Sequence, residues 1–122
     1  MAETPGEAGD VAGNVRVAGY FHPVVWSADG TVTALPGLGG GYAYAFDLDD
    51  AADVVGYAWT PTGDVHAVLW SSGTALDLNT ALDASGAGWV LFYARAIAST
   101  GVIVGFGAHD GTAAGFVLTP AP

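Results

Sequence analysis

The chain has 122 residues, of which 52% are hydrophobic, so it is long and apolar enough to form one domain with a buried core. Its 12 acidic residues stand against two arginines, Arg16 and Arg95, and no lysine, a formal net charge of −10 that argues against nucleic acid or an anionic membrane as partner. Cysteine is absent, which excludes disulfides, thiolate metal sites and cysteine nucleophiles.

The N-terminal stretch is small, polar and acidic. Residues 1–9 predict a flexible lead-in, without the basic start and apolar run of a signal peptide. No run approaches the roughly 18 apolar residues that cross a bilayer as a helix. We therefore expect a single repeat domain over residues 10–119.

Short β-branched and aromatic runs, separated by turn residues, follow from residue 10 onward. Strands are expected at residues 11–20, 24–26, 31–35, 42–48, 53–60, 66–70, 74–78, 89–98, 101–107 and 113–119. Residues 81–84 could form one helical turn. Because no segment has a sustained helical period, the predicted fold class is all-β.

Two landmarks recur three times along the chain. An apolar run closes on a glycine, and nine or ten residues later a second motif begins; the pairs are Gly13 with His22, Gly56 with His66, and Gly105 with Ala114. The second motif ends in Trp in residues 22–26 and 66–70, whereas residues 114–118 have lost both His and Trp. The repeat divides the domain into units at about residues 6–41, 42–79 and 80–119, and the first and third each lack one strand.

Units of this kind predict propeller-blade-like repeats of short antiparallel strands, as an open or partial β-propeller. A compact β-sandwich or barrel is the alternative. Propellers have about four or more blades, so three units are too few to close a ring. Strand edges and apolar faces left uncovered at both ends predict assembly with further copies into a homo-oligomer or filament, unless the chain closes on itself or is a fragment of a larger propeller.

The repeated stretches resemble the HAF family, a set of predicted extracellular repeats in which A-x-A-I-N-x-x-G-x-V-V-G is followed by H-A-F-L-W. The matching stretches are residues 94–98, 101–105, 66–70 and 77–79, and the resemblance covers residues 6–119. Asp49 and Ala98 stand where the family tends to have Asn. The resemblance implies an extracellular or cell-surface protein of propeller-like build, with no established activity and no cofactor.

His22 and His66 each precede a tryptophan, Trp26 or Trp70, by four residues, which places both side chains on one face of a strand. One interpretation is a metal ligand or a sugar-stacking platform. The other is structural: the ring bonds a neighbouring turn while Trp packs between sheets. The repetition favours the structural interpretation, and the loss of His from the third unit argues against a shared catalytic group.

Asp47, Asp49, Asp50 and Asp53 form the densest carboxylate cluster, and calcium prefers oxygen ligands from one loop. Without an internal glycine or a following bidentate Glu, the loop is only a weak calcium candidate. No catalytic residue or cofactor is predicted, because neither a G-x-S-x-G motif nor a phosphate-binding loop is present.

Trp59 and Trp89 break the repeat and are therefore expected to be exposed. Exposed aromatic side chains are typical of carbohydrate platforms and of protein interfaces. The leading hypothesis is a non-catalytic extracellular repeat module that self-associates as a structural or binding scaffold. A carbohydrate-binding, lectin-like module using Trp59 and Trp89 is the alternative, and a fragment of a propeller-type hydrolase is the third.

Overall fold

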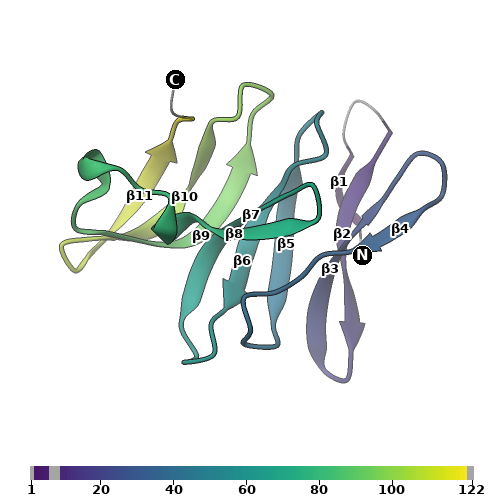
Figure 1. The fold of residues 1–122 in the computed structure, drawn as a ribbon, viewed down its shortest axis with the longest axis horizontal. Helices are drawn as coiled ribbons and strands as arrows, with labels where there is room; N and C mark the ends of the chain where they lie inside the picture. Colours follow the sequence, from purple (N-terminus) through teal and green to yellow (C-terminus); the bar gives the residue numbers. More distant parts are fainter. Residues whose placement is uncertain (1, 6–8, 121–122) are drawn as a thin grey trace.

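The computed structural model describes residues 2–5 and 9–120. They form three small antiparallel sheets that lie side by side in chain order (Figure 1). Sheet I contains β1 (Ala2–Pro5), β2 (Val11–Val17), β3 (Tyr20–Trp26) and β4 (Val32–Ala34). Sheet II contains β5 (Ala43–Leu48), β6 (Val54–Trp59), β7 (Val65–Ser71) and β8 (Thr74–Asp77). Sheet III contains β9 (Trp89–Ile97), β10 (Ile103–His109) and β11 (Thr112–Leu118).

This arrangement confirms the all-β, blade-like prediction, and the sheets stay open instead of closing into a barrel. Two short 3-10 turns, η1 (Leu78–Thr80) and η2 (Ala84–Gly86), connect sheets II and III. The sequence suggests a helical turn at residues 81–84, and η2 overlaps this range only at Ala84. In the described part of the chain, no helix is long and apolar enough to cross a membrane.

The N-terminal residues differ from the sequence-based prediction. Within the lead-in expected over residues 1–9, Ala2–Pro5 forms β1 and pairs antiparallel with β2. The prediction that the first unit lacks its opening strand is therefore wrong. The pairing satisfies backbone groups along one edge of β2, although the composition of β1 has no hydrophobic alternation to reveal it.

A β-bulge recurs opposite each landmark glycine. Ala45 pairs with Gly56 while Asp47 pairs with Val55, which leaves Phe46 as the extra residue of β5. Arg95 has the same place opposite Gly105, and residue 3 has it opposite Gly13. A Cβ on Gly56 would collide with the carbonyl oxygen of Tyr44, which explains why glycine is needed there.

Each pair of neighbouring sheets shares one apolar core. Between sheets I and II the core contains Ala12 and Val25 together with Val54, Val68 and Trp70. Between sheets II and III it contains Val55 and Ala67 together with Leu91, Ile103 and Phe116. We call the side of a sheet that faces the next sheet in chain order its forward face; Val55 lies on the forward face of sheet II. The opposite side is the backward face, on which Val54 lies.

Candidate functional site

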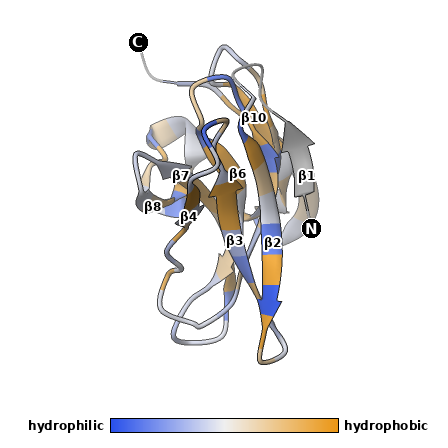
Figure 2. Cartoon of the chain, turned by 90° about the vertical axis from the view of Figure 1, so that its right-hand side faces the viewer, coloured by the Kyte–Doolittle hydropathy of each residue, from blue (hydrophilic) through white to orange (hydrophobic). Residues whose placement is uncertain are grey.

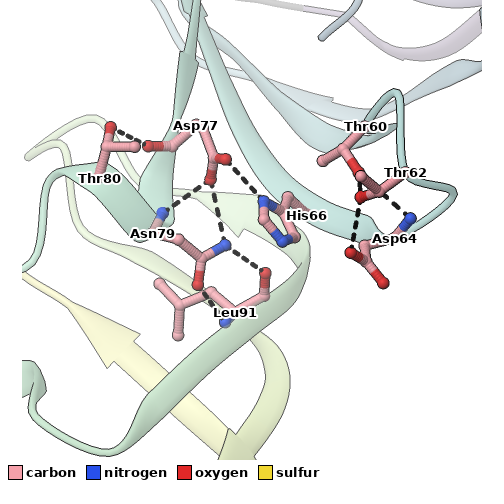
Figure 3. A network of polar contacts seen from close by, with 8 residues as sticks. All are labelled: Thr60, Thr62, Asp64, His66, Asp77, Asn79, Thr80 and Leu91. Carbon is pink, nitrogen blue, oxygen red and sulfur yellow. Dashed lines mark hydrogen bonds and ion pairs between the residues drawn. The ribbon is translucent and has the colours of Figure 1, made fainter. Parts of the chain in front are cut away.

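The second repeat histidine anchors a polar network between sheets II and III (Figure 3). His66 Nδ1 lies 2.6 Å from Asp77 Oδ2, and the other oxygen of Asp77 accepts hydrogen bonds from the backbone and side-chain nitrogens of Asn79. The Asn79 amide in turn donates to the Leu91 carbonyl and accepts from the Leu91 backbone N–H, at 2.9 and 2.7 Å. This geometry supports the structural interpretation of His66.

The equivalent histidine of sheet I has different surroundings. Val68 pairs with Asp77 in sheet II, whereas Val24 pairs with Ala34 in sheet I, so Ala34 stands where His66 finds its carboxylate. His22 is also exposed. The repeat places the two histidines equivalently, but the structural role seen at His66 depends on a residue outside the repeated motif.

Replacing each histidine with alanine tests which of the two has a structural role. We expect His66→Ala to lower the free energy of unfolding by about 1.5 kcal/mol, because a half-buried Asp77 loses its partner. The matched His22→Ala should change it by less than about 0.5 kcal/mol, as for an ordinary surface position. Urea denaturation of both variants measures the difference, and equal losses would contradict the assigned role of His66.

A buried asparagine makes a similar connection at the other interface. The side chain of Asn14 in β2 accepts from the Ala45 N–H at 2.7 Å and donates to the Ala45 carbonyl at 3.0 Å. Asn14 and Asn79 thus each bind both backbone groups of one residue in the next sheet. Sequence reasoning missed both roles, since a lone Asn beside a valine or leucine carries no distinctive spacing.

The repeat tryptophans are buried to different degrees. Trp70 is 1% exposed within the core between sheets I and II, and its Nε1–H donates to the Pro36 carbonyl at 2.6 Å. Trp26 is half-buried, on the backward face of sheet I. Only Trp70 has a second sheet packed over it in the described residues.

The aspartates expected to be a weak calcium candidate are directed to separate partners. Asp47 accepts from the Ile97 backbone N–H at 2.8 Å, which links sheet II to sheet III. Asp49 accepts from the N–H groups of Ala51 and Asp53 and closes the β5–β6 turn. Asp53 accepts from the Ser71 hydroxyl, and Asp50 is exposed. No three His, Asp or Glu side chains gather as a metal site within residues 9–120.

Trp59 and Trp89 belong to different surroundings. Trp59 is 40% exposed, and its ring centroid lies 5.3 Å from that of Tyr42. Trp89 is half-buried and stacks on His109 at 4.8 Å. Among the ring contacts of the described residues, none joins the two tryptophans. The structure therefore does not combine them into one aromatic platform.

An aromatic cluster that sequence reasoning missed connects all three sheets. Its members contact one another at centroid distances of 5.2 to 6.1 Å and comprise Tyr20, Phe21, Tyr42, Tyr44, Phe46, Tyr57, Trp59 and Tyr93. The two arginines lie over its edges, with Arg95 4.4 Å from the Phe46 centroid and Arg16 5.9 Å from that of Phe21. Burial among the neighbouring tyrosines raises the pKa of Tyr57.

The outermost faces of the terminal sheets are apolar and exposed. The forward face of sheet III presents Val104, Phe106 and Val117, of which Phe106 is 59% and Val117 68% exposed. The backward face of sheet I presents Val15, Val17 and Val32, and Figure 2 views this sheet from its free side. Exposed apolar patches of this kind mark interaction sites.

These faces correspond in register to faces that are buried elsewhere in the chain. Val104 pairs with Val117 and directly precedes Gly105, as Val55 pairs with Leu69 and directly precedes Gly56. Val55 and Leu69 pack against sheet III. The free forward face of sheet III is therefore the equivalent of a face that already binds a sheet.

The sequence matches no protein family model, and comparisons with curated proteins and with solved structures find no match either.

Proposed function

We propose that this chain is a non-catalytic repeat module that associates with copies of itself, with the forward face of sheet III of one copy against the backward face of sheet I of the next. An extracellular or cell-surface location, implied by the resemblance to HAF repeats, belongs to the same proposal. The contact is heterologous, so repetition forms a ring if the rotation closes and a filament if it does not.

One observation carries this proposal: the chain makes the same kind of contact twice within itself. Sheet I offers its forward face to the backward face of sheet II, and sheet II does the same toward sheet III. The two unused faces are the forward face of sheet III and the backward face of sheet I. A further contact of the same kind needs one forward and one backward face, which these two supply.

The sequence predicted that strand edges and apolar faces are uncovered at both ends of the chain. β1 completes a four-stranded sheet I, whereas sheet III has three strands. What remains uncovered in both terminal sheets is an apolar face. Burial of such a face is favourable by about 25 cal/mol per Å² of apolar surface, before the cost of association.

The net charge of −10 opposes association, because equal charges on the two copies repel each other. Salt screens this repulsion, with a Debye length of about 8 Å near physiological ionic strength. We expect light scattering to show an average mass that rises with both salt and protein concentration.

A charge on the free face should stop the association. Phe106→Asp is expected to give a monomer at all salt concentrations, whereas Ser99→Asp, which adds the same charge in the exposed β9–β10 turn, should assemble like the original chain. If the original chain is itself monomeric throughout, or if both variants assemble equally, the proposed interface is wrong.

A further inference from the structure

A cavity of about 610 Å³ lies between sheets II and III. Its wall is mostly apolar and includes Leu69, Leu76, Leu82, Trp89, Phe116 and Leu118. A volume of this size is in the range of small-molecule sites, which are usually apolar with a few polar groups.

The position of Leu118 accounts for part of this space. Leu118 pairs with Ile103, two residues before Gly105, and Trp70 pairs with Val54, two residues before Gly56. Leu118 therefore occupies in sheet III the place that Trp70 occupies in sheet II. A branched four-carbon side chain stands where the other interface has an indole ring.

The other interface shows what chemistry such a space accepts. The Trp70 ring is fully buried, with Leu35 and Leu38 packed against its core cluster and with the Pro36 carbonyl accepting from its N–H. In the second interface Leu78 follows Asp77 as Leu35 follows Ala34 in the equivalent register. The leucine wall is thus kept, as Leu78 and Leu82, while the ring is missing.

We infer that this cavity binds a small planar aromatic molecule of the indole class. The ring would lie against the leucines and Phe116, and Trp89, held by its stacking on His109, supplies an aromatic wall. The inference does not depend on self-association, since the cavity lies between two sheets of one chain. It also assigns Trp89 a role that does not involve sugars.

Isothermal titration of the whole chain with indole, together with its melting temperature, tests this inference. We expect saturable binding of one indole per chain, with a dissociation constant between about 10 µM and 1 mM for a ligand of this size, and a rise in melting temperature. Methyl glucoside should produce neither effect. Absence of saturable indole binding, or equal binding of the sugar, would overturn the inference.

Two variants locate the site. Leu118→Trp should supply the missing ring from the chain itself and weaken indole binding at least about tenfold, whereas Val104→Trp, on the opposite face of sheet III and outside the cavity wall, should leave it unchanged. Leu76→Glu, which places a charge in the wall, should also abolish binding and does not require the core to repack. If folded Leu76→Glu and Leu118→Trp bind indole as the original chain does, the cavity is not the site.

Discussion

Trp70→Ala should lower the free energy of unfolding by about 3 to 5 kcal/mol, the loss typical of removing a large buried aromatic side chain. The ring is 1% exposed, packs with residues of both sheets I and II, and donates a hydrogen bond to Pro36. The loss combines the transfer of the ring, the cavity that remains and an unsatisfied carbonyl.

The matched variant is Trp59→Ala. The Trp59 ring is 40% exposed, and its ring contact is with Tyr42. The free energy of unfolding should therefore fall by only about 1 kcal/mol. Chemical denaturation of the two variants measures both values. Similar losses would show that the repeated tryptophan does not mark the core.

Gly56→Ala should also be severe, with a loss on the order of 3 kcal/mol. A Cβ at this position meets the carbonyl oxygen of Tyr44 in the bulged neighbouring strand, and backbone atoms cannot move aside cheaply. Gly115→Ala is the control within a strand, because the nearest atom to its Cβ would be the Gly105 oxygen at 3.6 Å, an ordinary contact. Equal melting temperatures for the two variants would contradict the close approach at Gly56.

Much of the fold could be predicted from the spacing of a few residues. Gly13, Gly56 and Gly105 mark the second strand of each sheet, and the alternation of apolar residues around them predicts the remaining strands. The sequence did not show why glycine is required at these positions, because a β-bulge belongs to the neighbouring strand and leaves no periodic signal. β1 was missed for a related reason: it is recognised by pairing and not by its own composition.

The candidate sites were harder to predict, because each depends on which residues come together from separate strands. His22 and His66 look alike in the sequence, but only His66 faces an aspartate across the ladder. Trp59 and Trp89 were expected to share one function because both break the repeat, yet one contacts Tyr42 and the other His109. The carboxylates of residues 47–53 are close in sequence but bind partners in different directions.

Cross-linking between single-cysteine variants tests the central claim, that the two free faces are the two halves of one contact. Val117→Cys lies on the forward face of sheet III and Val15→Cys on the backward face of sheet I, and no other cysteine competes because the chain has none. With a short bismaleimide reagent at high salt, we expect a mixture of the two variants to give a cross-linked dimer that contains one of each, and little product from either variant alone. The claim would be contradicted if either variant formed cross-linked dimers with itself. It would also be contradicted if the mixture gave no product under conditions where light scattering shows assembly.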